Sequence, residues 1–301
     1  MNLRDMEYVV AVAEEKHFGR AADRCHVSQP ALSGQIQKLE DFLGVALFER
    51  TNRSVSITPV GEKIVAQAQQ LITMADEIVL TAQAAKDPLS GPFRLGMIAT
   101  IAPSLSPLIL AKIRDDLPNL SLTLVEGFTA DLEKAVAVGD LDGAILATAP
   151  EEQRLTEKLL YDEPFWIALP KGHTLCTNQS IDVCDLPHEE LLLLADGHCL
   201  RNQVLDVCSA NTGTANSNTR ETSLGTLLAL VAAGDGITLV PALSKPTNTP
   251  NIVTLKEASG TAGRIVRLAY RASFPRTAII EGLSDIVRQS VPKKLVRIIE
   301  P

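Results

Sequence analysis

The chain has 301 residues, of which 46% are hydrophobic and 21% charged, and 28 Lys and Arg against 36 Asp and Glu give a formal net charge of -8. This composition excludes disordered, collagen-like and disulfide-scaffold proteins, since five cysteines cannot staple a chain of this length. The acidity excludes a protein that coats nucleic acid without sequence preference, but it leaves room for a small basic segment that binds DNA.

The N-terminal segment does not resemble an export signal, because Asp5 and Glu7 stand where a basic and then an apolar stretch would be needed. The longest charge-free apolar stretch, residues 95–111, contains Pro103 and Pro107 and is typical of a strand, a turn and a helix. We therefore expect a cytoplasmic protein without a membrane partner. In that reducing compartment, paired cysteines are more often reactive or incidental than structural.

Residues 1–60 predict a small helical domain. Apolar residues recur at helical spacing between Leu3 and Ala13, and a second short helix fits Arg20–Arg24. The second segment contains two alanines, whose small side chains allow close packing of helices.

A third helix follows a clear start signal. Ser28 is a favourable N-cap, Pro30 fits the first helical turn, and Gly44 lies just past the expected end near Phe42. Two helices joined by a tight turn are typical of a helix-turn-helix motif. The segment 51–58 then predicts a hairpin wing.

The exposed face of the third helix offers side chains that can hydrogen-bond base edges or phosphates, namely Gln29, Ser33, Gln35 and Lys38. Residues 16–38 carry four Lys or Arg and one Asp, so this window has a charge of +3 within a chain of -8. A solvated helical hairpin with incidental charge explains the spacing equally well, so the pattern alone leaves both interpretations open.

From residue 64 to residue 85, apolar and small residues alternate in steps of four and three, at Ile64, Ala68, Leu71, Ala75, Ile78, Ala82 and Ala85. This period is typical of a coiled coil, and the alanines favour close approach of two helices. A dimer would place two helix-turn-helix domains on one duplex at a spacing fixed by symmetry. The alternative is an amphipathic helix that packs on its own domain.

Beyond Gly91, strand-like and helix-like segments alternate, which is typical of an α/β domain with helices on both faces of a parallel-type sheet. The expected strands are residues 93–98, 120–125, 143–147, 166–169, 191–194, 237–240 and 265–269, and the expected helices are residues 103–117, 131–138, 200–207, 224–233 and 276–289. Ligands of such folds bind beyond the carboxyl ends of strands. We expect Thr100 and Thr129 at that edge, because each directly follows a strand.

Cys199 and Cys208 stand at the two ends of a segment that predicts a short helix. If the segment is helical, nine residues separate the two by about 13 Å, whereas a disulfide needs Cα atoms within about 7 Å. Oxidation of the pair therefore requires the segment to refold, as expected of a switch. His198, Arg201 and a helix N-terminus favour the thiolate of Cys199, the form that attacks peroxide. Two small buried hydrophobes are the alternative.

The other cysteines predict less. Cys25 is expected as a packed residue at the helix-turn-helix turn, and Cys176 and Cys184 stand in a polar stretch as a less favoured second redox pair. No spacing of Cys and His fits zinc well, and the 4% aromatic content is too low for base-stacking surfaces. We expect no metal ion and no cofactor.

Residues 1–65 resemble the winged helix-turn-helix of LysR-type transcriptional regulators, on Phe18, Ala21, Ala22, the run from Ser28 to Ser33, Ile36, Leu39, Glu40, Leu43, Gly44, Leu47, Phe48, Arg50, Thr58 and Gly61. In this family the second helix of the motif enters the major groove and the wing touches the DNA backbone. The resemblance implies base contacts from Gln29 and Ser33. It implies phosphate contacts from Arg4, Lys38, Arg50 and Arg53, and a reading surface that includes Ser28, Pro30 and Ala31. Ala31 stands where relatives often carry Thr, so the preferred DNA sequence is expected to differ.

The remainder resembles the effector domain of the same family, on residues 139–142 and 231–237. The resemblance implies an α/β protein with an N-terminal winged helix-turn-helix, a long linker helix and a periplasmic-binding-protein-like effector domain of two subdomains, with crossovers near Asp162 and Arg267. The expected parts are residues 1–60 for DNA binding, 61–90 for a dimerising coiled-coil linker, 91–162 plus 268–301 for regulatory subdomain I, and 163–267 for regulatory subdomain II.

Residues 191–208 resemble the redox loop of the peroxide-sensing members of the LysR family. The resemblance, which spans nearly the whole chain, implies that Cys199 is the peroxidatic thiol and Cys208 the resolving thiol. It also implies a peroxide-binding set in which Thr100, Thr129 and His198 hold the peroxide and its bound water, and Arg264 supports the thiolate.

These resemblances imply a transcription activator, not an enzyme, that senses hydrogen peroxide through a reversible disulfide between Cys199 and Cys208. The expected partners are double-stranded promoter DNA, hydrogen peroxide, RNA polymerase, cytosolic thiol reductants and further copies of the chain, as a homodimer that assembles to a tetramer. The alternative is a LysR-type regulator that binds a small metabolite in the effector-domain cleft. A thiol peroxidase with an accidental N-terminal domain is a further alternative.

Overall fold

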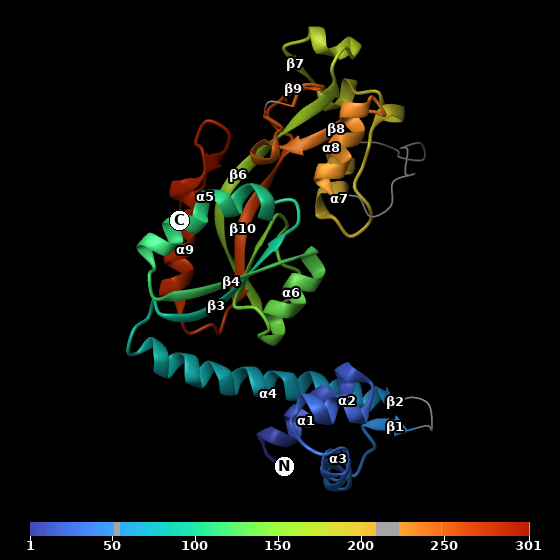
Figure 1. Ribbon diagram of the computed structural model, residues 1–301, viewed down its shortest axis with the longest axis vertical. Helices are drawn as coiled ribbons and strands as arrows, with labels where there is room; N and C mark the ends of the chain where they lie inside the picture. Colours follow the sequence, from blue (N-terminus) through green and yellow to red (C-terminus); the bar gives the residue numbers. More distant parts are fainter. Residues whose placement is uncertain (51–54, 209–222, 248, 301) are drawn as a thin grey trace. The chain divides into compact units, whose positions relative to one another are not determined.

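The computed structural model describes residues 1–50, 55–208, 223–247 and 249–300, which form two compact units, Met1–Ala85 and Lys86–Pro301 (Figure 1). Among these residues, no helix combines the length and the apolar character that a membrane crossing requires.

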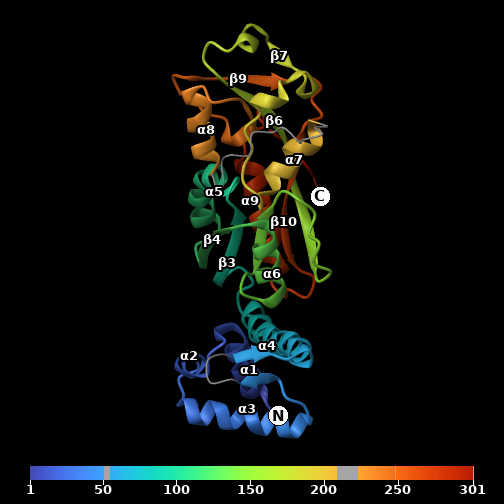
Figure 2. The same ribbon diagram turned by 90° about the vertical axis from the view of Figure 1, so that its right-hand side faces the viewer.

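The N-terminal unit contains three short helices, a two-stranded wing and a long helix (Figure 2). The elements are α1 (Leu3–Glu15), α2 (Phe18–Arg24), α3 (Gln29–Leu43), β1 (Phe48–Arg50), β2 (Val55–Ile57) and α4 (Pro59–Ala84). The expected start and end of the third helix are confirmed. Ser28 caps α3 and accepts a hydrogen bond from the Ala31 N–H, and Gly44 ends it in the left-handed conformation.

The wing is tied to α3 by a buried carboxylate. Glu40 is 8% exposed, and its Oε1 accepts hydrogen bonds from the backbone N–H groups of Leu47 at 2.7 Å and Phe48 at 3.2 Å. Phe48 begins β1, which pairs antiparallel with β2. The carboxylate therefore supplies a hydrogen-bond acceptor for two backbone N–H groups that lie beyond the end of α3 and are shielded from water.

The residues of the predicted coiled-coil seam lie in two different environments along α4. Ala68 is fully buried and Ile64 packs against the core of the N-terminal unit, so the first two seam positions face their own domain. From Leu71 onward several apolar side chains are exposed, with Met74 at 61% and Ile78 at 71%, while Ile72 still packs against the core of the N-terminal unit. The amphipathic-helix interpretation therefore holds for the start of α4, whereas the rest of the helix carries an apolar stripe that no described residue covers.

The second unit is built on one mixed sheet with the strand order β4-β3-β5-β10-β6-β9-β7, and β8 and β11 also pair with β6. The strands are β3 (Gly91–Ile98), β4 (Leu120–Gly127), β5 (Gly143–Leu146), β6 (Leu155–Pro170), β7 (Ser180–Ile181), β8 (Thr238–Pro241), β9 (Ile252–Glu257), β10 (Gly263–Arg271) and β11 (Arg297–Ile298). The helices are α5 (Ala102–Asp116), α6 (Thr129–Val138), α7 (Cys199–Val207), α8 (Leu224–Ala233) and α9 (Thr277–Ser290).

Two long strands connect two subdomains within this unit. Up to Pro164, β6 pairs with β10, and from Phe165 onward it pairs with β8 and β9. The helices α5, α6 and α9 accompany the first part of the sheet, whereas α7 and α8 accompany the second (Figures 1 and 2). Arg267 is the first residue of β10 that pairs with β5.

The expected parallel-type sheet is only partly correct. β3 pairs parallel with β4 and β5, but β10 is antiparallel to both β5 and β6. The predicted strand at Leu191–Leu194 is wrong, since these residues form a single bridge between Leu191 and Ile237 while all four side chains are buried. A continuous apolar run shows burial but does not show strand pairing. The two-residue strands β7 and β11 are too short to leave a periodic pattern.

We expect Glu40→Ala to destabilise the wing and the end of α3 by about 2 kcal/mol, because two buried N–H groups lose their acceptor. Amide hydrogen exchange of the full chain at Leu47 and Phe48 measures this. The control is Glu49→Ala, which removes an exposed carboxylate from β1 and should change exchange little. Unchanged protection in Glu40→Ala would contradict the assigned role.

Candidate functional site

The two candidate thiols occupy opposite ends of one helix. Cys199 is the first residue of α7 and Cys208 is its C-cap, and both are free thiols. A helical rise of 1.5 Å per residue separates them by about 13 Å, well beyond the distance of about 7 Å that a disulfide spans. The predicted helix is therefore confirmed, and this conformation cannot contain a disulfide between the two.

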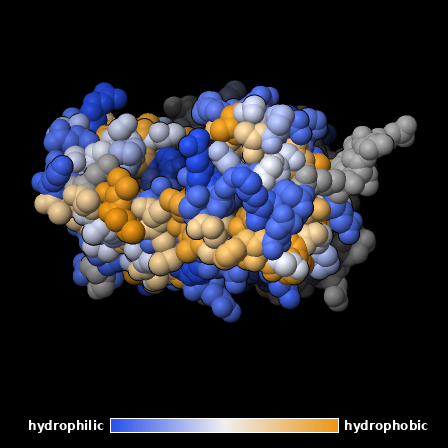
Figure 3. Space-filling view, turned by 90° about the horizontal axis from the view of Figure 1, so that it is seen from below, coloured by the Kyte–Doolittle hydropathy of each residue, from blue (hydrophilic) through white to orange (hydrophobic). Residues whose placement is uncertain are grey.

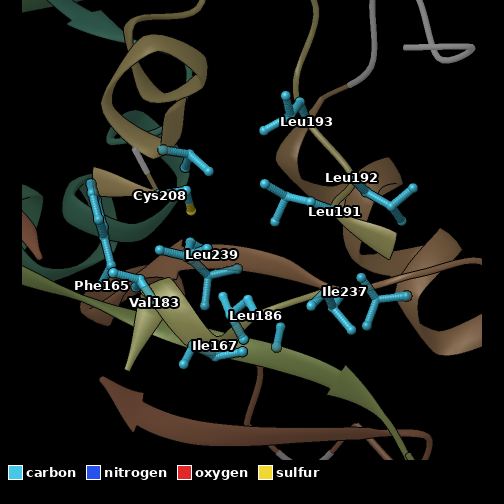
Figure 4. Packing of buried hydrophobic residues seen from close by; sticks show 14 of the residues in the cluster. Phe165, Ile167, Val183, Leu186, Leu191, Leu192, Leu193, Cys208, Ile237 and Leu239 are labelled. Carbon is cyan, nitrogen blue, oxygen red and sulfur yellow. The ribbon is translucent and has the colours of Figure 1, made fainter. Parts of the chain in front are cut away.

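Two kinds of interaction hold α7 in place. They are apolar packing on one side of the helix and a hydrogen bond on the other. Leu200, Val204 and Cys208 are at most 2% exposed and belong to the core of the second subdomain, where Cys208 lies in one cluster with Phe165 and Leu239 (Figure 4). This packing joins α7 to the sheet of its own subdomain. The residues that follow Cys208 up to position 222 lie outside the described residues.

Gln203 connects α7 to the first subdomain. Its Nε2 donates to the carbonyl oxygen of Ala147 at 2.8 Å, directly after β5. Its Oε1 is buried and makes no hydrogen bond within the described part of the chain. Sequence reasoning missed Gln203, because nothing in a nine-residue helix indicates which polar residue reaches a strand end 56 residues earlier.

Cys208 is held as an unreactive thiol while α7 is folded. Burial raises the pKa of Cys208 from its ordinary value of 9.0 to about 11, and the nearby Cys184 adds to the rise. Cys184 is exposed, and a hydrogen bond to Asp182 raises its own pKa. Because a thiolate is the nucleophilic form, Cys208 is protected from reaction at neutral pH.

The start of α7 lies against the first subdomain. The His198 ring packs edge-to-face on Phe128, with ring centroids 4.9 Å apart, and Phe128 directly precedes Thr129. Gly197 has a φ of 95°, a conformation that favours glycine, and this turn brings the chain to the start of α7 at Cys199.

The positive charge expected beside Cys199 is not supplied by its neighbours. Burial lowers the pKa of His198, so its ring is neutral at neutral pH. The Arg201 guanidinium pairs with Asp196 at 3.0 Å and donates to the carbonyl oxygen of Leu194. Cys199 itself stands at the N-terminal end of α7, where the first backbone N–H groups have no partner within the helix.

Two of the predicted residues meet in a buried network. Arg264 donates from Nη1 to the Thr100 hydroxyl at 2.9 Å and from Nη2 to the Thr100 carbonyl oxygen at 3.2 Å. Its guanidinium also pairs with Glu163 at 2.9 Å, and both side chains are buried. Glu163 in turn accepts a hydrogen bond from the Leu243 N–H. The network therefore joins the end of β3 to the crossover strands and to the second subdomain.

Thr129 has a hydroxyl that suits a small polar ligand. Its Oγ1 is buried and has no hydrogen-bond partner among the described residues. Thr100 and Thr129 both follow parallel neighbouring strands, β3 and β4, as the sequence predicted. Glu163 was missed, because a charged residue in a strand gives no sign that it pairs with an arginine 101 residues later.

The predicted DNA-contacting residues mostly lie on the exposed side of α3. Ser28, Gln29, Pro30, Ala31 and Lys38 are exposed, and Ser33 is half-buried. Arg4 is exposed, with its guanidinium 5.8 Å from the Tyr8 ring centroid. Arg53 and the side chain of Arg50 lie outside the described residues.

Gln35 is not available to DNA as expected, because its Nε2 donates to the buried Asp5 at 2.8 Å. Figure 3 shows hydrophilic and hydrophobic residues interspersed on one face of the molecule. In the part of the chain that the structure describes, no three His, Cys, Asp or Glu side chains gather to hold a metal ion.

Comparison with known proteins matches both units. Residues 3–62 match the bacterial regulatory helix-turn-helix proteins of the lysR family, and residues 86–292 match the LysR substrate binding domain. The hydrogen peroxide-inducible genes activator of Pectobacterium carotovorum subsp. carotovorum is 41% identical over 291 residues, which cover 96% of each chain.

Two solved structures are also similar to the chain. The full-length OxyR of Pseudomonas aeruginosa with a Cys-to-Asp substitution has a TM-score of 0.79 and 40% identity, covering 97% of this chain and 99% of that one. A hydrogen peroxide-bound mutant of Corynebacterium glutamicum OxyR has a TM-score of 0.65 and 34% identity, covering 96% and 92%.

We expect alkylation of Cys208 by iodoacetamide to depend steeply on pH in the native reduced chain. A pKa raised from 9.0 to about 11 lowers the thiolate fraction at pH 8 by about 100-fold. The rate should therefore rise about tenfold per pH unit until the pH approaches that pKa. Mass spectrometry of the labelled peptides measures this, with the denatured chain as control. Equal native and denatured rates at pH 8 would show that Cys208 is not protected.

Proposed function

The chain belongs to the LysR family of bacterial helix-turn-helix regulators, and from this premise we propose that it senses hydrogen peroxide through Cys199 and Cys208 and changes its binding to promoter DNA in response. One observation carries the proposal. The two thiols stand at the ends of a helix that contacts both subdomains, so they can bond only if that helix refolds.

The chemistry is a two-electron reduction of peroxide by two thiols. The Cys199 thiolate attacks one peroxide oxygen, the O–O bond breaks, and hydroxide leaves and takes a proton to form water. Cys199 is then a sulfenic acid. The Cys208 thiol condenses with it, forming the S–S bond and releasing a second water. Cytosolic thiol reductants reverse the change by thiol–disulfide exchange.

Residues from both subdomains support the first step. The Thr129 hydroxyl has hydrogen-bonding capacity that its neighbours leave unused, and the His198 ring, neutral at neutral pH, packs on Phe128, the residue directly before Thr129. Thr100 is held by Arg264, which Glu163 orients. These groups offer hydrogen-bonding atoms that can position a small polar molecule such as peroxide.

The second step explains how chemistry becomes a change of shape. Bringing the two Cα atoms within about 7 Å requires α7 to unwind. Unwinding removes Leu200 and Val204 from the core and breaks the hydrogen bond from Gln203 to Ala147. The two subdomains lose a connection when the disulfide forms, which supports a changed arrangement of the regulatory units.

The N-terminal unit supplies the output. The exposed stripe on α4 from Leu71 to Ile78 would pair with the same stripe of a second copy, giving a homodimer with two α3 helices for one duplex. We further propose assembly of dimers to a tetramer in the cytoplasm, and activation through contact with RNA polymerase. A relative named for hydrogen peroxide-inducible genes and a peroxide-bound relative support peroxide as the signal.

We expect peroxide to shift the footprint of the wild-type chain on a promoter fragment that the purified protein selects, and to leave the footprint of Cys199→Ser unchanged. Without the attacking thiol, no sulfenic acid forms and α7 stays folded. Cys184→Ser is the matched control, because it removes an exposed thiol and should retain the response. DNase footprinting with and without peroxide measures the effect.

The alternatives give different footprints. A metabolite-binding regulator would show a wild-type footprint that peroxide does not alter. A thiol peroxidase with an accidental N-terminal domain would show no sequence-specific footprint and would consume peroxide continuously.

We expect Ile78→Asp to weaken the dimer by about 100-fold, because each copy would lose an apolar side chain from the interface and bury a charge. Analytical ultracentrifugation of the full chain measures the dissociation constant. Ala66→Asp, an exposed change in the part of α4 that precedes the stripe, should leave the dimer intact. Equal dissociation constants for Ile78→Asp and the wild type would remove α4 from the proposed interface.

A further inference from the structure

A cleft that contains none of the residues assigned to the proposed function lies between the C-terminal segment and the turn that joins β9 to β10. Its volume is about 950 Å³, within the range of about 300–1,000 Å³ that small-molecule sites span. One wall consists of residues 288–289 and 293–298, which follow α9 towards the end of the chain drawn in red in Figure 1. The other wall is the turn at residues 260–263.

The cleft lies across β6 from the network that holds Thr100. Asp162 of β6 lines the cleft, whereas Glu163, the next residue, pairs with Arg264 and through it with Thr100. Successive side chains of a strand point to opposite faces. The cleft is therefore separate from the site at Cys199, although the same crossover strand borders both.

The side chains that line the cleft give it a positive charge. Among the described lining residues are four cations and two carboxylates, a net charge of +2 in a chain of -8. They are Arg288, Lys293, Lys294, Arg297, Asp162 and Glu300.

The two arginines of this set are already engaged within the chain. Arg297 pairs with Asp162 at 2.8 Å. Arg288 is 7% exposed, pairs with Asp285 at 3.2 Å and donates to the Leu159 carbonyl oxygen at 2.7 Å. The Nε of Arg288 is buried and has no hydrogen-bond partner in the described ranges. This wall therefore holds a buried cation with one donor that the chain itself does not use.

The two lysines are held by a turn and lack a counter-ion. The Pro292 carbonyl oxygen accepts hydrogen bonds from the N–H groups of Leu295 at 2.8 Å and Val296 at 3.3 Å, which closes a turn around Lys293 and Lys294. Both lysines are exposed, and neither forms an ion pair with another described residue. Two adjacent ammonium groups repel each other, and a bound anion would relieve this repulsion.

The opposite wall is uncharged and has a fixed shape. The Glu257 carboxylate is 8% exposed and accepts hydrogen bonds from the N–H groups of Ser259 at 2.8 Å and Gly260 at 2.7 Å. It thereby holds the turn that faces the lysines. The turn lines the cleft with two glycines, a threonine and an alanine, so its small side chains leave space for the body of a ligand.

We infer that this cleft binds a small molecule with at least two negative charges, carried by phosphate or carboxylate groups, whose charge Lys293 and Lys294 neutralise. Charge-assisted hydrogen bonds from ammonium groups to such oxygens are stronger than neutral ones. The inference goes beyond the proposed peroxide response and does not depend on it, since binding to this cleft needs neither Cys199 nor DNA.

The test titrates the reduced full-length chain with sodium pyrophosphate and, separately, with sodium citrate, by isothermal titration calorimetry at fixed ionic strength. At least one of the two anions should bind with one site per chain and a dissociation constant below about 1 mM. The double variant Lys293→Ala/Lys294→Ala should raise that dissociation constant at least about tenfold, because two charged donors are lost. Both replaced residues are exposed, so the fold should be retained.

Lys134→Ala/Lys171→Ala is the matched control. It removes the same two positive charges from exposed positions that do not line the cleft. It should keep the wild-type dissociation constant.

The outcomes separate the possible explanations. Binding of pyrophosphate alone would identify phosphate as the recognised group, and binding of citrate alone would identify carboxylate. Binding of neither anion would overturn the inference. An unchanged dissociation constant in Lys293→Ala/Lys294→Ala would also overturn it. Equal weakening in both double variants would do the same, because affinity would then follow the net charge of the chain.

Discussion

The length of α7 decides whether the regulatory unit can form a disulfide between Cys199 and Cys208. Cys199 and Cys208 stand at its two ends, and a helix of this length holds them about twice as far apart as a disulfide allows. The folded α7 and a disulfide between Cys199 and Cys208 therefore cannot exist together. Any event that bonds the two sulfurs must disrupt α7, whose folded form places Leu200 and Val204 in the core and Gln203 on Ala147.

The incompatibility between a folded α7 and the proposed disulfide also affects the reduction potential of that disulfide. Burying an apolar side chain contributes about 1.5–3 kcal/mol, so exposing Leu200 and Val204 costs about 4 kcal/mol. Since 1.4 kcal/mol corresponds to about 30 mV for a two-electron couple, this cost would raise the reduction potential of the proposed disulfide by about 90 mV. A higher potential means easier reduction. The packing that stabilises the reduced fold would thus favour the return of the proposed disulfide to two thiols.

Local signals were readable from the sequence, and long-range pairings were not. Ser28 and Pro30 marked the start of α3, and the apolar spacing after Cys199 marked α7. The partners of Glu163 could not be found, because strand alternation predicts which residues are buried and not which distant arginine neutralises them. The start of the α4 seam was misread for a related reason, since tertiary packing buried Ala68 against its own domain.

The charges around the site are compensated, and this bears on why the chain suits regulation better than turnover. Asp196 pairs with Arg201, Glu163 pairs with Arg264, and the His198 ring is neutral at neutral pH. Cys199 stands at the N-terminus of α7, the positive end of that helix's dipole. That feature exists only while α7 is folded. In the proposed reaction the disulfide consumes the Cys199 thiol, so the chain cannot react again until a reductant restores both thiols. Exposure to peroxide would then be recorded as a change of shape that lasts until reduction.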